Sequence, residues 1–335
     1  MKPKLEFYRY QPLEHREIRV LQIDVDPNIS PQDITTDLCC SLLVVSLDKC
    51  NAFDALSYTW GPATMDEQME WAQQIFTTVL ACCPIHVDGK IALVTKSLRN
   101  ALRRLRQSLH PESIALAAEN HFAARSKLIW IDGLCINQQN DSEKNQQAPL
   151  MADIYSKANL VHAYVGEHDA SSLAGLEAGV ALGNLCHDAF KSNFRKEKAM
   201  GIDQIVSLLG LPKWRAWVKF LCRKWFFRAW VMQEIILETR DITLTCGATS
   251  IVLTHWVNCL NFLGPAGWGQ YLMIKLQDEL DMVQYKERAS RWLTLGHPLQ
   301  SANQMRMRLK KTQTQAFYAL SCFVCLRSDA MLESA

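Results

Sequence analysis

One glutamate, Glu234, is the strongest candidate for chemistry because of the helix on which we expect it to lie. Residues 230–237 read WVMQEIIL, and on a helix Glu234 shares one face with Trp230 and Leu237. No basic residue stands three or four positions away from it. A carboxylate in such apolar surroundings either finds hydrogen-bond donors elsewhere or holds its proton more tightly. Glu234 is therefore a candidate catalytic carboxylate; the structural alternative buries it against backbone amides or an arginine such as Arg228.

A second polar group follows the short apolar segment at residues 128–131, which ends abruptly at Asp132. Asn137, Gln138 and Glu143 come next, between this strand and the helix predicted after it. So many hydrogen-bonding groups at the carboxyl end of a predicted strand suit a ribose or another polar ligand. In the alternative, these side chains only satisfy the backbone of their own loop. Cys135 lies among them, but no histidine or other base is near it in the sequence, which disfavours a catalytic thiol.

A third group lies at residues 57–61, which read SYTWG. Ser57 and Tyr58 supply hydroxyls and Trp60 supplies an indole at the end of another predicted strand. Packing of the two aromatic rings in the core is the alternative. The carboxyl ends of parallel strands share one edge of a sheet, where ligands of open α/β folds bind. We therefore expect the second and third groups to meet at that edge.

Strands alternate with helices along most of the chain. Alternating and apolar segments predict strands at residues 17–24, 38–47, 53–60, 84–94, 128–131, 160–165 and 241–246. Periodic segments predict helices at residues 97–109, 143–158 and 214–238. This alternation predicts an α/β fold with a mainly parallel sheet flanked by helices, in a flavodoxin-like layout with helical insertions.

Three local sequence features add detail to this predicted fold. Asp88-Gly89 predicts the turn of a β-hairpin with positive φ angles. Asn140 followed by Glu143 resembles a capping box that opens a helix. Pro149 must kink or restart that helix, because proline lacks the amide donor that a helix interior needs.

Composition excludes several classes of protein. The 335 residues are 49% hydrophobic and carry a net charge of +2, so nothing demands nucleic acid as a partner. No apolar run approaches the ~20 residues of a membrane span, and the amino-terminal residues do not resemble a signal peptide. Twelve cysteines without a secretory signal predict reduced thiols in a cytoplasmic protein.

Sequence signatures of metal and nucleotide enzymes are missing. Cys322 and Cys325 have metal-ligand spacing, but no second pair accompanies them, so we predict no metal site. The chain has no GxGxxG, GxxxxGK[ST], GxSxG or HExxH segment. No resident cofactor is therefore predicted.

Taken in order, these segments resemble the fungal HET domain of the heterokaryon incompatibility family. The resemblance runs from about residue 8 to 250 and is most specific at ALSYTWG (residues 55–61), CINQ (135–138) and RAWVMQE (228–234). It implies a HET domain over residues 1–250, with its core at about 50–250, and a helical C-terminal extension over 251–335. Residues 312–321 match the later family pattern only faintly, which leaves open whether the extension is complete.

The resemblance implies a role in fungal nonself recognition, in which the domain triggers programmed cell death. HET domains are also similar to TIR domains, in which a helical glutamate cleaves NAD. By that analogy Glu234 is catalytic and NAD is a substrate. Its ribose and base are then bound by a set of residues comprising Ser57, Tyr58, Trp60, Asp132, Asn137, Gln138, Arg228 and Trp230. The alternative is a non-enzymatic signalling module that associates with itself or with another incompatibility protein, or a degenerate family member.

Overall fold

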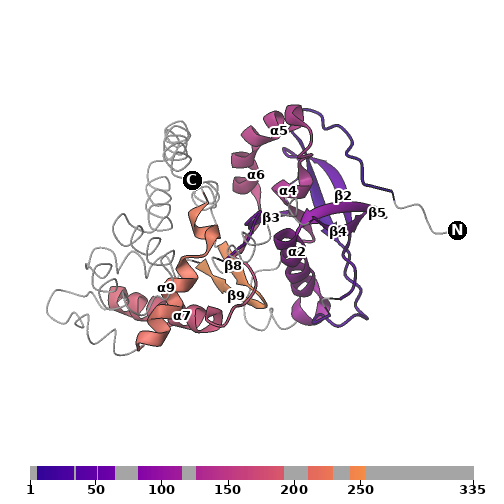
Figure 1. The fold of residues 1–335 in the computed structure, drawn as a ribbon. Helices are drawn as coiled ribbons and strands as arrows, with labels where there is room; N and C mark the ends of the chain where they lie inside the picture. Colours follow the sequence, from indigo (N-terminus) through magenta and orange to yellow (C-terminus); the bar gives the residue numbers. More distant parts are fainter. Residues whose placement is uncertain are drawn as a thin grey trace, which may run out of the picture. The chain divides into compact units, whose positions relative to one another are not determined.

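The computed structural model describes residues 6–33, 35–50, 52–64, 82–114, 126–191, 210–228 and 242–253 (Figure 1). The chain forms two compact units. The first comprises Met1–Glu167 and Glu238–Ile251, and the second comprises His168–Leu237 and Val252–Ala335. The domain boundary predicted near residue 250 stays a prediction, because nearly all of the extension lies outside the described residues.

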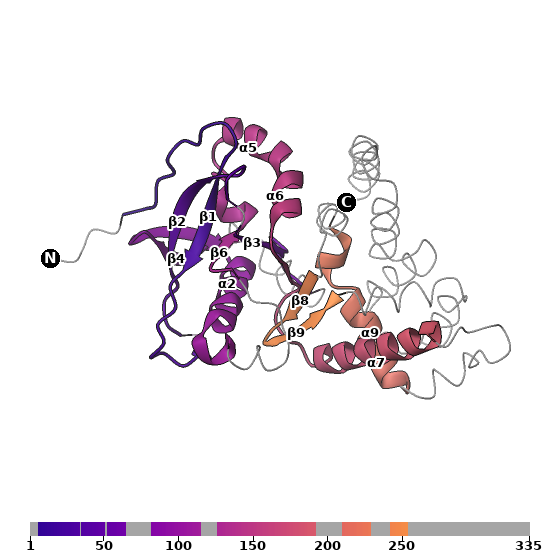
Figure 2. The ribbon, with the colours of Figure 1, turned by 180° about the vertical axis from the view of Figure 1, so that it is seen from behind.

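Within the described residues, the strands form one sheet in the order β5-β4-β2-β1-β6-β3-β7-β8-β9 (Figures 1 and 2). Their bounds are β1 Glu17–Ile23, β2 Cys39–Ser46, β3 Asp54–Tyr58, β4 Cys82–Val87, β5 Lys90–Thr95, β6 Leu128–Trp130, β7 Val161–Tyr164, β8 Ile242–Cys246 and β9 Thr249–Val252. Every residue of β3 and β7 is buried, as expected of central strands.

The sheet is mixed, which corrects the mainly parallel sheet predicted from the sequence. The neighbours β6, β3, β7 and β8 run parallel, and β2 is parallel to β4. In contrast, β1 is antiparallel to both β2 and β6, and β4 is antiparallel to β5. The reason lies in the connections, since antiparallel neighbours need only a loop whereas parallel neighbours need a crossover. A tight turn joins β4 to β5, and the positive φ angles of Asp88 and Gly89 there confirm the predicted hairpin.

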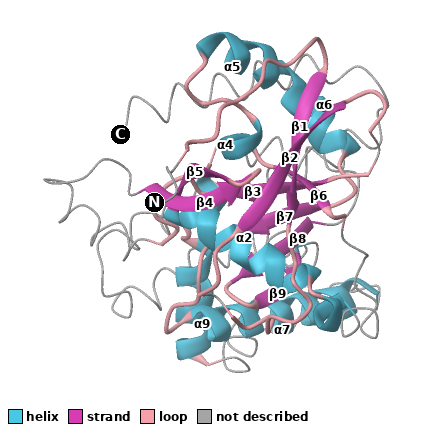
Figure 3. Cartoon of the chain, turned by 90° about the vertical axis from the view of Figure 1, so that its right-hand side faces the viewer, coloured by secondary structure: helices cyan, strands magenta, loops and turns pink. Residues whose placement is uncertain are grey.

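Helices of the first unit pack on this sheet (Figure 3). Helix α2 (Lys96–Leu109) begins with the Thr95 hydroxyl accepting the Leu98 amide and buries an apolar stripe near β3, β4 and β5. Helices α4 (Asp132–Cys135), α5 (Asp141–Gln147) and α6 (Met151–Lys157) follow β6. The Asn140 side chain caps α5, as predicted, and the 3₁₀ turn η1 (Ala148–Leu150) at Pro149 separates α5 from α6.

The described part of the second unit is helical. It comprises α7 (Ser172–Lys191), α9 (Leu211–Leu221) and the 3₁₀ turn η2 (Lys224–Phe227). Helices α7 and α9 approach closely at Gly175, where a Cβ atom would stand 2.7 Å from the carbonyl oxygen of Ala216. The buried Arg223 guanidinium donates to Asp169 and to the Ser172 hydroxyl, which fixes the chain ahead of α7. Within the described residues, no helix has the length and hydropathy of a membrane span.

Candidate functional site

The exposed part of the candidate site lies just beyond the carboxyl ends of β3 and β6. These strands are parallel neighbours, so Trp60 and Asp132, each two residues past a strand end, emerge at the same edge of the sheet. The Trp60 indole Nε1 donates to Asp132 Oδ2 at 3.0 Å. The Gly133 amide donates to the other carboxylate oxygen, Oδ1, at 2.6 Å. The meeting of these two predicted site residues at one edge is therefore observed.

The SYTWG segment divides into a buried part and an exposed part. Ser57 and Tyr58 are 1% and 2% exposed, so they belong to the core, while Trp60 keeps 39% of its surface in solvent. Tyr58 lies under the loop that carries Asp132, because a Cβ atom on Gly133 would stand 2.2 Å from the Tyr58 hydroxyl oxygen. Core packing thus accounts for Tyr58, whereas Trp60 presents its ring at the surface.

The two amide side chains of the loop hold the loop itself. Gln138 Nε2 donates to the main-chain carbonyl of Asp132 at 2.7 Å. The Asn137 side-chain oxygen accepts the amide of Gln139 at 3.1 Å. Their predicted role in binding a ligand stays a prediction; Gln138 positions the main chain at Asp132, and Asn137 holds the turn that follows it.

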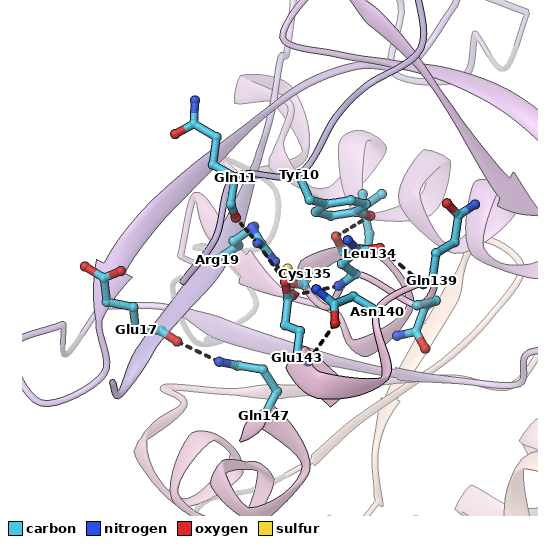
Figure 4. Close-up of polar contacts among 12 residues, drawn as sticks. Tyr10, Gln11, Glu17, Arg19, Leu134, Cys135, Gln139, Asn140, Glu143 and Gln147 are labelled. Atoms are coloured by element: carbon cyan, nitrogen blue, oxygen red, sulfur yellow. Dashed lines mark hydrogen bonds and ion pairs between the residues drawn. The ribbon is translucent and has the colours of Figure 1, made fainter. Parts of the chain in front are cut away.

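A buried ion pair anchors the far end of this loop (Figure 4). Arg19 of β1 is 1% exposed and Glu143 of α5 is 7% exposed. Arg19 Nη1 donates to Glu143 Oε1 at 2.6 Å and to the carbonyl of Cys135 at 3.0 Å. The Asn137 amide donates to the same Glu143 oxygen at 2.8 Å. Strand, loop and helix therefore converge on one carboxylate.

The amino-terminal segment completes this cluster. The second guanidinium nitrogen of Arg19 donates to the carbonyl of Gln11. The guanidinium carbon of Arg19, Cζ, lies 4.8 Å from the centre of the Tyr10 ring. The Tyr10 hydroxyl donates to the carbonyl of Leu134 at 3.0 Å. The sequence reasoning missed Arg19 and Tyr10; the available signal was an arginine within the otherwise apolar strand EIRVLQI.

Electrostatics agree with a structural role for the cluster. Burial raises the pKa of Glu143, but the hydrogen bonds from Arg19 and the Asn137 amide outweigh burial, so the net pKa lies below its ordinary value. Cys135 is buried, and burial raises the pKa of its thiol to about 12. A thiol of that pKa is not ionised near neutral pH, which agrees with the prediction that Cys135 is no nucleophile.

A second carboxylate, Glu167, lies past the end of β7, the other parallel neighbour of β3. The Tyr164 hydroxyl donates to Glu167 Oε1 at 2.6 Å, and Arg104 of α2 forms an ion pair with the same carboxylate. Burial and the Glu167 charge raise the pKa of Tyr164. Sequence reasoning stopped at Gly166 and missed Glu167, although an acidic residue directly after a strand and a glycine was a usable signal.

The remaining predicted residues belong to the second unit. Arg228 follows η2 and is half-buried. Trp230 and Glu234 lie outside the described residues, so the catalytic role of Glu234 and the substrate contacts of Trp230 and Arg228 stay predictions. Cys322 and Cys325 also lie outside them. Across the described segments, no group of three His, Cys, Asp or Glu side chains could hold a metal ion.

The segment that contains most of these residues matches a known protein family. The family model described as "Heterokaryon incompatibility protein (HET)" matches residues 53–234, which is more than half of the chain. Over 255 residues the chain is 25% identical to heterokaryon incompatibility protein 6, OR allele, of Neurospora crassa. This alignment covers 68% of the chain but only 34% of the relative, so the chain spans about a third of the relative's length. No solved structure matches the chain.

Proposed function

Because the chain belongs to the heterokaryon incompatibility (HET) family, we propose that it acts in fungal nonself recognition and triggers programmed cell death when incompatible hyphae fuse. The Neurospora crassa relative carries heterokaryon incompatibility in its name, and the family match confirms the resemblance first seen in the sequence motifs. The matched residues include Trp60 and Asp132 and extend to Glu234. The proposal assigns the signal to this shared domain, acting through self-association or through another incompatibility protein.

The observation that carries the molecular part of the proposal is the Trp60–Asp132 pair. An exposed indole held by a carboxylate at the carboxyl edge of a sheet offers a stacking surface for a planar ring. The second carboxylate oxygen of Asp132 holds the Gly133 amide, so the indole and the loop keep a fixed relation. This arrangement supports a ligand with a base and a ribose, and NAD has both.

The proposed reaction is hydrolysis of the nicotinamide–ribose bond of NAD. The bonding electron pair moves to the ring nitrogen, which leaves as neutral nicotinamide, and positive charge builds on the ribose. Water then attacks the anomeric carbon and releases a proton, giving ADP-ribose. The proposed role of Glu234 is to stabilise the positive charge with its carboxylate, an effect that can supply several kcal/mol.

The test is NAD loss and nicotinamide release by the purified full chain at high protein concentration. We expect Glu234→Ala to abolish turnover while circular dichroism shows intact folding. Trp60→Ala should raise KM roughly fivefold or more, since stacking of a base on an aromatic ring contributes about 1–3 kcal/mol. The exposed residue Glu177 supplies a matched control for the lost carboxylate, Glu177→Ala, which should turn over NAD like wild type.

Expression in fungal cells separates death signalling from NAD chemistry. Wild-type protein that kills cells, measured by uptake of a vital dye, without lowering cellular NAD would support the non-enzymatic signalling alternative. Death and NAD loss that both disappear in Glu234→Ala would support the enzyme. Neither effect from wild-type protein would contradict the proposed function of this chain.

A further inference from the structure

The side of β2 that faces away from β1 is open along most of the strand. Residues 40–46 of β2 pair with β1 (Figure 3). On the other side of β2, strand β4 pairs with only Cys39 and Cys40. Within the described part of the chain, no strand lies beside residues 41–46 on that side. Beyond Cys40, β2 is therefore an edge strand, although it stands inside the strand order of the sheet.

The main-chain groups of Leu42 and Val44 face this open side. In an antiparallel pair, residues that exchange hydrogen bonds with the partner strand alternate with residues whose N–H and C=O groups point away from it. The amide of Asp24 donates to the carbonyl of Cys39 at 3.0 Å, which assigns the odd-numbered residues of β2 to the bonds with β1. Among the described residues, no hydrogen bond reaches the main chain of Leu42 or Val44 on the open side.

Two other strand edges are each covered by a contact. On β5, the amide of Ile91 donates to the carbonyl of Glu6 and its carbonyl accepts the amide of Tyr8, both at 2.8 Å. On β1, the side chain of Gln147 donates to the carbonyl of Glu17 at 2.8 Å. The structure shows no such contact at residues 42–44 of β2 in the part of the chain that it describes.

The side chains of this open edge are apolar and accessible. Leu43 and Val44 are 40% and 44% exposed. Residues 41–46 read SLLVVS, without the lysine or proline that usually prevents pairing at a strand edge. An open row of N–H and C=O groups is completed by an extended chain that adds a further strand. Because the edge carries no charge, two copies of it can lie side by side without repulsion.

From these observations we infer that β2 pairs with β2 of a second copy of the chain, antiparallel about a two-fold axis at Leu43. Leu42 of each copy then lies opposite Val44 of the other, and the amide of each donates to the carbonyl of the residue opposite. The two Leu43 side chains meet at the axis. Such a contact uses the same surface on both copies and closes at a dimer. The inference rests on the proposed function for its biological role, since it assigns the self-association to this edge.

Sedimentation of the purified full chain over a series of concentrations tests the inference, and a reversible monomer–dimer equilibrium is expected. Leu43→Lys places two like charges at the axis and should weaken the dimer about tenfold or more. Val44→Pro removes the Val44 donor from each copy and should weaken the dimer by a similar factor, since proline is tolerated where the N–H of an edge strand faces outward. The control Leu93→Lys makes the same change at a leucine of β5 that is 53% exposed, and it should leave the dimer unchanged.

A pair of opposite charges separates a lost contact from a lost fold. Leu43→Lys and Leu43→Glu should each be monomeric at concentrations where wild type is dimeric, and an equal mixture of the two should dimerise. Circular dichroism checks that each variant is folded. Monomers at every wild-type concentration, growth beyond a dimer, equal weakening by Leu93→Lys, or no dimer in the mixture would each overturn the inference. None of these measurements uses NAD or cell death, so the inference and the proposed function can fail separately.

Discussion

The two ends of the segment from Asp132 to Glu143 serve opposite purposes. At the Glu143 end, a buried ion pair with Arg19 joins β1, the loop and α5. At the Asp132 end, the carboxylate holds a partly exposed indole, that of Trp60. One end is thus committed to the fold and the other is presented to solvent. The difference teaches that one short segment can join a carboxylate that holds the fold together to a carboxylate that local contacts hold at the surface.

The energetic cost of these two ends also differs. Burying both charges of an ion pair is expensive, and only additional hydrogen bonds make the pair tolerable. Arg19 and Glu143 meet this requirement nearly in full, because the loop carbonyl of Cys135 and the amide of Asn137 also contact them. Only Nε of Arg19 has no partner among the described residues. The exposed pair at Asp132 carries no comparable desolvation cost.

Removing one buried charge should have the largest effect on stability and tests whether the two ends of the segment differ. We expect Arg19→Met to lower the free energy of unfolding by about 3–5 kcal/mol, because it leaves Glu143 buried without its cation. Urea unfolding followed by circular dichroism measures the loss. The control is Arg16→Met, which removes the more exposed ion pairs of Arg16 with Asp48 and Asp153 and should cost much less than Arg19→Met.

A double variant separates an uncompensated charge from lost packing. Arg19→Met combined with Glu143→Leu should recover most of the stability lost in the single variant, since replacing a whole buried pair with apolar residues is often neutral. A loss in Arg19→Met no larger than that in Arg16→Met would remove the distinction between the two ends of the segment.

A smaller effect is expected at Gly133, next to Asp132, where this end of the segment packs against the core. Alanine normally favours a helix over glycine, but its Cβ here would stand 2.2 Å from the hydroxyl oxygen of Tyr58. We expect Gly133→Ala to destabilise the chain by about 1–3 kcal/mol in urea unfolding. Tyr58→Phe removes the clashing oxygen, so the cost of alanine should be markedly smaller in that background. Gain of stability in Gly133→Ala would show that Tyr58 does not press on the loop.

Local signals in the sequence predicted local structure well. Asn140 caps α5, Pro149 divides the helix that follows, and Asp88-Gly89 forms the hairpin turn. Each of these depends on the chemistry of one or two residues and their neighbours. The pairing of β1 with β6 does not, because it joins strands that lie far apart in the sequence, such as at Leu21 and Ile129. That is why the sheet was predicted as mainly parallel and is mixed.

At the candidate site, too, local features were predicted from the sequence and contacts between distant residues were not. Strand ends predicted that Trp60 and Asp132 would meet, and they do. The pattern alone could not separate buried Tyr58 from exposed Trp60, since both rings lie in the one strand predicted at residues 53–60. Arg19 was missed because its partner Glu143 lies 124 residues away in the chain, and no local spacing reports such a pair.

The same substitution at two tryptophans of this edge should give the smallest and most direct contrast. Trp60→Phe removes the Nε1 donor to Asp132 at the surface, and we expect it to change the free energy of unfolding by less than about 1 kcal/mol. Trp130→Phe leaves a cavity at a fully buried position beside Tyr155, and we expect a cost of about 2 kcal/mol. Urea unfolding measures both. Near-equal losses in the free energy of unfolding would mean that Trp60 is part of the core. The Asp132 end of the segment would then offer no exposed indole for a ligand.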